Sequence, residues 1–583
     1  MNYISPIYTE LTECQDCYKC LRNCPAKAIR VENAHAIIVP ELCVMCGRCV
    51  VHCPAHAKKI RDDVARAKQI IKQKKTFVSL APSFVSEFSE FTPAQLCAAL
   101  KKLGFYAISE TAIGADLVSS QVADDLKAAS SAKNEQKLFL SSACPSTVEY
   151  IKQLFPYYAK YITDRSSPLL AHARFLHKKY GSDIGIIFIG PCIAKKRESD
   201  VWNIIDIALT FNDLHDWLER ERITPETIGE ETANQSECFV PFRAAGGSLY
   251  PIDGGMITSV KKYTNTPDAL FMTVTGLDSI PEALAGLKPE LLKEPLFIEL
   301  LACHGGCING PGTKKGNSTA YKRVQLLDYA ETAKDALPAS IITNKPDMTG
   351  TLPVDAHIQP AYTEEQIQGA LRSVGKYTTA DELNCSCCGY DTCRDFAKAM
   401  LNSYAEKSMC ISYMRKLAQK KANSLIKAIP SGVLIADRKM QVIECNYNFA
   451  KLMGRDVVEM YEAKPGLEGA DITKLIEFHR FYTDVLAING PDIIEREVHK
   501  GKKIYHVTVF AIEKGEVVGS VIHDITAPQV QKDRIVSQAH KVIDKNLSVV
   551  QKIAFLLGEN AAETESMLDS IIESFSSGDE DDE

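Results

Sequence analysis

The segment ELLACHGGCINGPG, residues 299–312, places Cys303 and Cys307 on either side of a Gly-Gly pair. Two further cysteines stand far upstream in short frames of small residues, Cys144 in SSACPS and Cys192 in GPCIAKKRE. Thiolates on such loops can hold an iron–sulfur cube, and glycine lets the backbone approach an inorganic cluster where a Cβ atom would clash. We therefore predict that these four cysteines bind one cluster.

The composition limits the class of protein. The 583 residues are enough for roughly three to five domains, and the hydrophobic content of 45% is ample for buried cores. The net charge of −7 argues against a nucleic-acid partner, which would require a basic surface. No apolar run approaches the ~18 residues of a membrane span, and the N-terminus shows no signal peptide. We expect a cytoplasmic protein without a membrane partner.

The twenty cysteines favour metal binding over disulfides, and eight of them form an internal repeat. The pattern C-x2-C-x2-C-x3-C-P occurs twice, displaced by 29 residues, and is typical of a two-cluster ferredoxin in which the fourth cysteine of each run crosses to the other cluster. Residues 1–60 are thus predicted to bind one 4Fe-4S cluster through Cys14, Cys17, Cys20 and Cys53. The second would be bound by Cys43, Cys46, Cys49 and Cys24. A pair of zinc sites is the alternative, because CxxC pairs also bind zinc.

Residues 75–360 alternate apolar strands with amphipathic helices. KLFLSSACPS, IGIIFIGPC and LFIELLACHGGC each consist of a predicted strand that ends at a cysteine loop. Alternating strands and helices favour an α/β domain, whose functional groups lie at the carboxyl ends of the strands. We therefore expect the four thiolates at one edge of the sheets.

In order and spacing, the three cysteine segments resemble the signature segments of FeFe hydrogenases, over roughly residues 1–410. The resemblance implies an H-cluster whose cube is bound by Cys144, Cys192, Cys303 and Cys307. It also implies that Cys307 bridges to a diiron subsite carrying CO, cyanide and a dithiolate. Lys195 matches the lysine that hydrogen-bonds a cyanide, a role that suits a cationic donor. The implied reaction is heterolytic cleavage of H2.

The departures from the family pattern concern proton transfer. The usual TSCCP is SSACP here, so the relay cysteine is replaced by Ala143, whose methyl group cannot carry a proton. Gln121 and Val122 stand where carboxylates are expected, which leaves Asp124 and Asp125 as the nearest acids. Losing one positioned proton-transfer group typically costs ~10²–10⁴ in rate. We therefore expect a centre of low turnover that responds to H2 or to redox state.

Several alternatives stay open. A proton route through Asp124, Asp125, water or His304 would permit an ordinary catalytic hydrogenase that exchanges electrons with ferredoxin. His304 itself replaces a proline that many members have, and a loop histidine is more often a solvated side chain. A third alternative is a non-catalytic iron–sulfur redox sensor that keeps the cube but lacks the diiron subsite. The intact GPCIAKKRE segment with Lys195 argues against it.

A further cysteine cluster follows at LNCSCCGYDTCRDFAKAM, residues 383–400. Residues 361–420 are predicted to form a third 4Fe-4S module bound by Cys385, Cys388, Cys393 and Cys410. The alternative is a zinc knuckle.

Residues 421–528 resemble a PAS domain, in which a helix, a hairpin and an Asn-x-x-Phe turn precede closing strands of alternating pattern. Residues 529–575 are predicted to be a signalling or dimerisation helix, and residues 576–583 an acidic tail. PAS folds sense or dimerise, and the fold alone does not choose between these roles.

The sequence thus predicts a multidomain α+β and α/β chain that resembles a sensory, PAS-containing FeFe hydrogenase. The expected cofactors are an H-cluster and three further 4Fe-4S clusters. The expected partners are H2, protons, ferredoxin or another electron carrier, and a kinase or phosphatase as signalling effector. A homodimer through the PAS domain and the C-terminal helix is also expected.

Overall fold

The structure is a computed structural model that describes residues 5–131, 136–229, 238–263, 269–314, 316–332, 336–354, 360–501 and 503–526, with single residues 542 and 545. It contains two compact units, one of residues 1–372 and 377–406 and the other of residues 373–376 and 407–583. The predicted C-terminal helix and acidic tail lie outside the described residues, apart from those two positions. Among the described residues, every helix is too short or too polar to span a bilayer.

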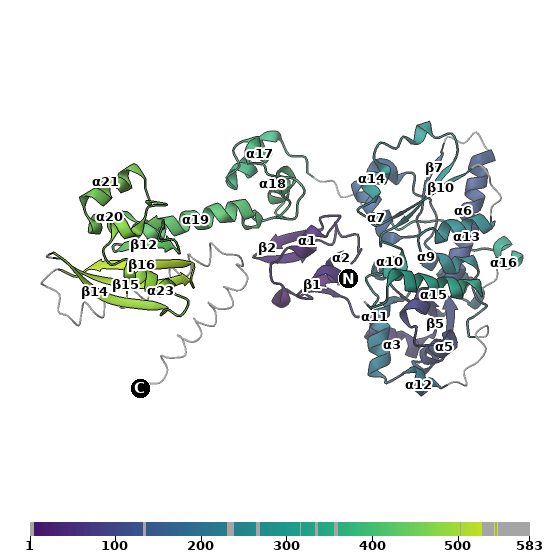
Figure 1. Cartoon of the computed structure of the whole chain (residues 1–583). Coiled ribbons are helices and arrows are strands. Elements are labelled where there is room, and N and C mark those ends of the chain that lie inside the picture. Colours follow the sequence, from purple (N-terminus) through teal and green to yellow (C-terminus); the bar gives the residue numbers. More distant parts are fainter. Residues whose placement is uncertain are drawn as a thin grey trace. The chain divides into compact units, whose positions relative to one another are not determined.

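The first unit begins with a small domain built twice on one plan (Figure 1). Two antiparallel strand pairs join β1 (Ile7–Thr9) to β4 (Lys58–Ile60) and β2 (Ile29–Glu32) to β3 (His35–Ile38). The helices α1 (Lys19–Arg22) and α2 (Arg48–His52) each begin after a left-handed residue, Tyr18 at φ 54° and Gly47 at φ 73°. These residues occupy the same position in the 29-residue repeat, so the backbone repeats along with the cysteines.

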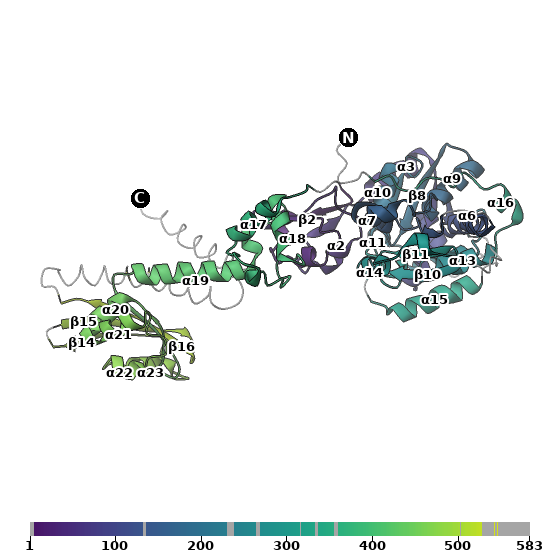
Figure 2. The same cartoon turned by 90° about the horizontal axis from the view of Figure 1, so that it is seen from above.

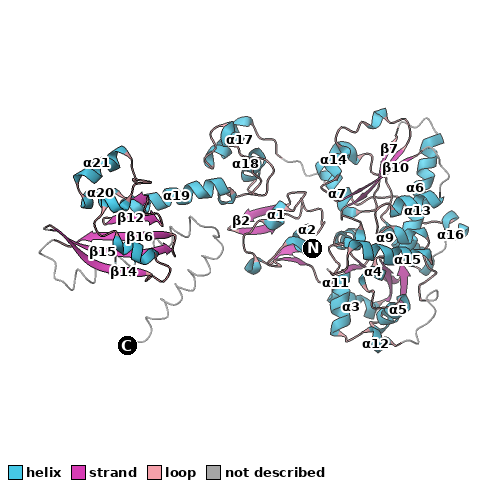
Figure 3. Ribbon diagram, viewed as in Figure 1, coloured by secondary structure: helices cyan, strands magenta, loops and turns pink. Residues whose placement is uncertain are grey.

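Two parallel sheets follow in the same unit (Figure 3). The four-stranded sheet has the order β6 (Ala107–Glu110), β5 (Lys75–Leu80), β8 (Ile184–Gly190), β9 (Ile207–Thr210). The three-stranded sheet has the order β10 (Leu270–Thr275), β11 (Leu296–Leu301), β7 (Leu138–Leu140). Every residue of β8 is buried, as expected for a parallel strand covered on both faces.

The helices of this α/β region lie around its two sheets (Figure 2). They are α3 (Val64–Gln73), α4 (Phe84–Glu87), α5 (Pro93–Lys102), α6 (Ala112–Ser131), α7 (Pro145–Leu154), α8 (Pro156–Ala159), α9 (Pro168–Tyr180), α10 (Ala194–Val201), α11 (Phe211–Arg220), α12 (Pro225–Ile228), α13 (Gly255–Tyr263), α14 (Ile280–Leu284), α15 (Thr319–Glu331) and α16 (Ala339–Thr343). One hydrophobic core joins strands of both sheets, through Phe77 of β5 and Phe297 of β11, to residues of α5, α6, α9 and α11. The arrangement is the mixed α/β fold that the alternating pattern predicts.

The first unit ends with a short module whose helices are α17 (Glu364–Ser373) and α18 (Cys393–Leu401). It contacts the small N-terminal domain that contains β1 to β4, which we call the ferredoxin-like domain. Lys27 Nζ donates to the carbonyl of Gly389 over 2.8 Å, and the amide of Val31 donates to the carbonyl of Tyr404 over 2.9 Å. A Cβ atom on Gly389 would lie 2.8 Å from Leu21 Cγ, so glycine permits this close approach.

The second unit contains α19 (Ile411–Ala428) and a five-stranded antiparallel sheet. The strand order is β13 (Val442–Cys445), β12 (Gly432–Asp437), β16 (Val517–Asp524), β15 (Lys503–Glu513), β14 (Ile493–Lys500). The helices α20 (Tyr447–Met453), α21 (Arg455–Ala463), α22 (Ile472–Leu475) and α23 (Arg480–Leu486) share a hydrophobic core with one face of this sheet. Ala422 and Ile426 of α19 pack on the other face, against Val433 and Ile435.

Candidate iron–sulfur and catalytic site

The three cysteine loops each follow the carboxyl end of a parallel strand. Cys144 follows β7 and is the N-cap of α7, whose first residue is Pro145. Cys192 lies between β8 and α10, and Cys303 follows β11. Because parallel strands end at the same edge of a sheet, the two sheets bring these loops together at one end of the α/β region.

Backbone contacts bring the second and third loops together. The amide of Gly312 donates to the carbonyl of Pro191 over 2.9 Å, which joins the loop after Cys307 to the loop before Cys192. Gly306, at φ 94°, passes so close to Pro251 that a Cβ atom would lie 2.2 Å from its carbonyl oxygen. Only glycine fits there, which explains the second glycine of the pair between Cys303 and Cys307.

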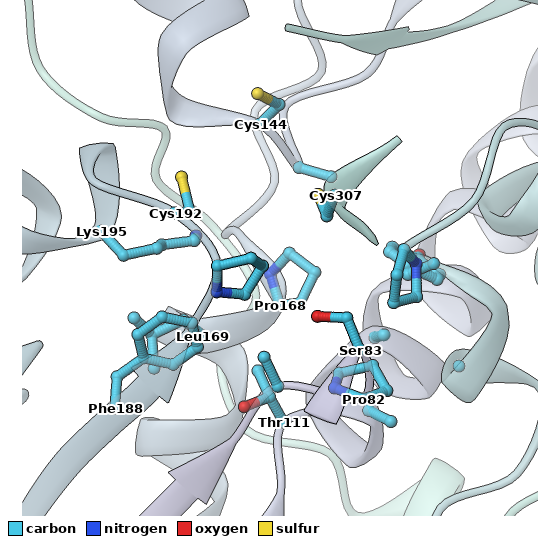
Figure 4. A pocket seen from close by; sticks show the side chains of 18 of the residues that line it. Pro82, Ser83, Thr111, Cys144, Pro168, Leu169, Phe188, Cys192, Lys195 and Cys307 are labelled. Carbon is cyan, nitrogen blue, oxygen red and sulfur yellow. The ribbon is translucent and has the colours of Figure 1, made fainter. Parts of the chain in front are cut away.

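A cavity of about 100 Å³ lies between the loops, with Cys144, Cys192 and Cys307 in its wall (Figure 4). Cys303 is close enough to interact electrostatically with all three of these cysteines. The structure thus brings the four predicted thiols together. Most of the cavity wall is apolar and comes from alanine, proline, leucine and phenylalanine side chains.

The electrostatics of the four thiols fit a cationic cluster. Burial, together with the neighbouring Cys144, raises the pKa of Cys192 to about 11. Burial and mutual repulsion raise the pKa values of Cys303 and Cys307 as well. Crowded buried thiolates are costly unless a metal offsets their charge, and binding to iron requires the deprotonated form. The donor set therefore suits an iron–sulfur cluster.

A single metal ion fits the described residues less well. They contain no group of three or more His, Cys, Asp or Glu side chains placed to hold one ion. A tetrahedral zinc site needs all of its ligands at ~2.0–2.3 Å from one centre. A cube binds each thiolate through a different iron and so tolerates wider spacing.

Ser83 and Tyr250 are among the polar groups of the cavity wall that were not anticipated from the sequence. Ser83 is 1% exposed, and its Oγ has no hydrogen-bond partner among the described residues, so it is available to a bound group. Tyr250 also lines the cavity, and its hydroxyl lies 2.9 Å from Ser119 Oγ. Neither residue stands in a cysteine frame, and the spacing of Ser83 and Tyr250 in the chain gives no signal of their convergence.

Lys195 lies in the cavity wall, as Figure 4 shows. Its ammonium group donates to Ser167 Oγ over 2.9 Å and forms a short ion pair with Glu198. Ser167 is also the N-cap of α9. The two partners fix the lysine against the cavity, which suits a donor to a bound anionic group.

Ala143 also lines the cavity, whereas the alternative acids do not. Asp125 forms an ion pair with Arg165 at 2.7 Å, and Asp124 forms one with Lys345 at 2.8 Å. His304 is 60% exposed and is likewise absent from the cavity wall. The structure therefore places none of the three suggested substitutes for the relay cysteine at the cavity.

The ferredoxin-like domain holds a smaller cavity of about 20 Å³. Its wall includes all four thiols of one predicted cluster, namely Cys24, Cys43, Cys46 and Cys49. Cys24 comes from the other cysteine run, which is the crossing that the ferredoxin pattern predicts. In the other predicted set, Cys20 is close enough to Cys14 and Cys17 for electrostatic interaction.

The third module shows a less enclosed cysteine set. Cys385 is exposed and Cys388 partly buried, whereas Cys393 is buried at the first position of α18. Cys410 is the N-cap of α19 in the second unit. Binding of a cluster by these four cysteines remains a prediction.

Comparison with known proteins assigns parts of the chain. Residues 74–311 match the family model of the C-terminal domain of the iron-only hydrogenase large subunit, and residues 6–54 match a 4Fe-4S dicluster domain. Residues 381–412 match a putative Fe-S cluster model.

Curated relatives cover similar parts of the chain. Iron hydrogenase 1 of Clostridium pasteurianum is 23% identical over 305 residues, which are 44% of this chain and 52% of that protein. The periplasmic Fe hydrogenase large subunit of Nitratidesulfovibrio vulgaris is 24% identical over 309 residues, 45% of this chain and 72% of that protein. The nuclear prelamin A recognition factor of Xenopus laevis is 22% identical over 334 residues, 49% of this chain and 70% of that protein. The match therefore spans only about half the length of the Clostridium protein.

Solved structures give weaker similarities. An FeFe-hydrogenase from Chlamydomonas reinhardtii is 19% identical, with a TM-score of 0.39, and the match covers 47% of this chain and 91% of that one. A PAS domain from Bordetella pertussis is 15% identical, with a TM-score of 0.15, and the match covers 22% of this chain and 97% of that one. The assignment rests on the family models and the curated relatives: this chain carries the C-terminal domain of an iron-only hydrogenase large subunit, preceded by a 4Fe-4S dicluster domain.

Proposed function

We propose that this protein is an FeFe hydrogenase of low turnover that senses H2 or redox state and passes the signal to its PAS-like second unit. The H-cluster, when held by Cys144, Cys192, Cys303 and Cys307, would supply the heterolytic cleavage of H2. The observation that carries the proposal is Ala143, which lies in the cavity wall where the family places a proton-carrying cysteine.

The cavity wall supports slow proton transfer. Its polar residues include Ser83, Thr111, Lys195 and Tyr250, but no aspartate, glutamate or histidine side chain of the described residues lines it. Hydroxyl groups pass protons only within hydrogen-bonded chains, and the chain from Thr111 through Ser79 leads to His172, whose pKa burial lowers to about 3. Without a carboxylate or imidazole in the cavity wall itself, we expect exchange of protons with solvent to limit turnover.

The ferredoxin-like domain contacts both the loop after Cys307 and the third module, which supports electron transfer between the predicted clusters. A Cβ atom on Gly47, in the ferredoxin-like domain, would lie 2.5 Å from Pro311, four residues after Cys307. The same domain also contacts the third module at Gly389. Electrons released at the cavity would pass through these sites toward ferredoxin or another carrier.

The second unit would convert this electron flow into a signal. Cys410, the fourth proposed ligand of the third module, is the N-cap of α19, and α19 packs through Ile426 against the sheet. A homodimer, a kinase or phosphatase effector and a cytoplasmic location are parts of the same proposal.

The replacement Ala143→Cys tests the proposal. Restoring the thiol should raise H2 turnover of the matured protein by up to ~10²-fold. Ala115→Cys is the matched control, because Ala115 also lines the cavity but on α6, and it should leave turnover low. High native turnover that Ala143→Cys does not change would favour the ordinary catalytic hydrogenase instead.

A second candidate is a non-catalytic iron–sulfur redox sensor without the diiron subsite. One relative, the Xenopus protein, is similar at 22% identity and is named as a recognition factor rather than a hydrogenase. This candidate predicts cluster signals but no H2 turnover, in the native protein and in Ala143→Cys alike.

A further inference from the structure

Three polar side chains meet where the ferredoxin-like domain contacts the loop of Cys303. Arg48 forms a short ion pair with Asp278, and its Nη2 lies 3.0 Å from His304 Nε2. The same Nε2 lies 3.0 Å from Asp278 Oδ1. We call Arg48, Asp278 and His304 the interdomain triad.

The triad stands between two cysteine sites. Arg48 lies in the run that contains Cys46 and Cys49, and its backbone amide donates to Cys46 Sγ. His304 directly follows Cys303, and Cys303 is close enough to Cys46 for electrostatic interaction. We call the cluster predicted on Cys24, Cys43, Cys46 and Cys49 the adjoining cluster, because its loop touches the loops of the cube.

Two glycines, which lack a Cβ atom, permit the close packing around the triad. Gly276, at φ 87°, lies under the imidazole ring of His304, where a Cβ atom would approach Cε1 to 2.1 Å. Gly47 lets the cysteine run pack on Pro311 and Ile193, where a Cβ atom would lie 2.5 Å and 2.8 Å from their side chains. One glycine in the ferredoxin-like domain and one in the α/β region therefore allow the two domains to approach closely at the triad.

We propose that the interdomain triad sets the reduction potential of the adjoining cluster: Arg48 raises it, and Asp278 opposes Arg48. This inference rests on the proposed function, since it requires the cluster to be bound. It concerns an electrostatic role for the three side chains: none lines the larger cavity, whereas Arg48 lines the smaller cavity of the adjoining cluster.

The sign follows from electrostatics. Reduction adds an electron, so a nearby cation and a hydrogen bond to a ligand sulfur both favour the reduced cluster. Arg48 supplies both, through its guanidinium group and its amide. Asp278 offsets the guanidinium charge, which makes the reduced cluster less stable than it would be beside a lone arginine. His304 gives Arg48 a second partner and holds the pair against the loop of Cys303.

Water limits the size of the effect. The side chains of Arg48, Asp278 and His304 are 22%, 55% and 60% exposed. Salt screens exposed charges over a Debye length of ~10 Å at 0.1 M. The shifts are therefore expected to be larger at low ionic strength than in molar salt.

A redox titration of the full chain, monitored by electron paramagnetic resonance of its reduced 4Fe-4S clusters, tests the inference. Arg48→Gln should lower the midpoint potential of the adjoining cluster, and Asp278→Asn should raise it. His304→Ala should shift it less than either charge variant. Lys68→Gln is the control, because it removes one cation of α3 that forms an exposed ion pair with Glu221. It should leave all midpoint potentials unchanged.

Opposite shifts in the two charge variants would not arise from a general loosening of the domain. Shifts of the same sign, or shifts no larger than that of Lys68→Gln, would overturn the inference. Cluster signals with unshifted potentials would leave the proposed function intact. A wild-type protein with full iron incorporation but no 4Fe-4S signal would overturn the proposed function and the inference together.

Discussion

The ammonium nitrogen of Lys196 is fully buried and lies 3.1 Å from a carboxylate oxygen of Asp63. Asp63 belongs to the segment that joins the ferredoxin-like domain to β5, and Lys196 to the helix that begins two residues after Cys192. A second carboxylate, that of Asp213, lies 2.9 Å from the same nitrogen. The network therefore ties the domain linker to the cysteine loop of the cavity.

Replacing Lys196 by methionine should destabilise the first unit. The change removes the cation shared by Asp63 and Asp213. Asp63 keeps Arg61 and Arg66, so the loss should lie at the lower end of the about 3–5 kcal/mol that breaking a buried ion pair costs. Urea unfolding measures this loss. Lys68→Met removes one partner of an exposed pair and should cost less than about 1 kcal/mol. Similar losses in the two variants would contradict the role assigned to the network.

His172 should make the stability of the first unit depend on pH. Its ring is fully buried, with Nδ1 2.8 Å from Ser79 Oγ and Nε2 2.9 Å from Ser109 Oγ. Burial lowers the pKa of His172 to about 3, from 6.5 in the unfolded chain. Between these values the unfolded state binds one proton more, so the free energy of unfolding falls as pH falls.

The histidine contribution is complete above about pH 6.5 and is lost at about 1.4 kcal/mol per pH unit below it. From pH 7 to pH 5 the loss is about 2 kcal/mol. Urea unfolding at pH 7 and pH 5 measures the free energy of unfolding at each pH. Between these pH values, His172→Gln should lose about 2 kcal/mol less of this free energy than the wild type. Equal pH dependence in both proteins would show that the histidine is not held neutral.

Asn446 should be the main polar link between α19 and the sheet of the second unit. Its Nδ2 lies 3.0 Å from the carbonyl of Ile426 and 2.8 Å from that of Ser431, and its Oδ1 accepts from the amide of Val433 over 2.9 Å. Asn446→Ala leaves these buried groups unpaired, so we expect a loss of about 2–4 kcal/mol in the free energy of local opening.

Hydrogen exchange of the amides of α19 and β12 measures this opening. Asn448→Ala is the matched control, since Asn448 donates to a single carbonyl, that of Ile429, over 2.8 Å. Its effect should be about 1 kcal/mol. Exchange that is unchanged in Asn446→Ala would contradict the role of Asn446 as the main polar link between α19 and the sheet.

Local spacing made much of this architecture predictable. The cysteine repeat predicts two equivalent turns, and the structure places Tyr18 and Gly47 in the same left-handed conformation. The segments before Cys144, Cys192 and Cys303 form β7, β8 and β11, and each of these strands pairs in parallel with a neighbour. Both signals come from residues close in sequence.

Long-range pairing was not predictable in the same way. Lys195 and Lys196 are adjacent and alike, but one turns toward the cavity and the other toward Asp63, because neighbouring helix residues point about 100° apart. The partners of Asp124 and Asp125, which are Lys345 and Arg165, lie on distant segments, so their ion pairs leave no local trace in the sequence. The 60% exposure of His304 agrees with the solvated side chain expected of a loop histidine, but its contacts with Arg48 and Asp278 join three separate parts of the chain and leave no local trace in the sequence.

The central claim is that Cys144, Cys192, Cys303 and Cys307 hold one cube that carries a diiron subsite. Infrared spectroscopy of the matured full-length protein tests it most directly. The account predicts bands of iron-bound CO and cyanide that disappear in Cys307→Ser and persist in Cys445→Ser, which alters a buried cysteine of β13 in the second unit. A matured protein with a full complement of iron but no such bands, or bands that survive Cys307→Ser, would contradict it.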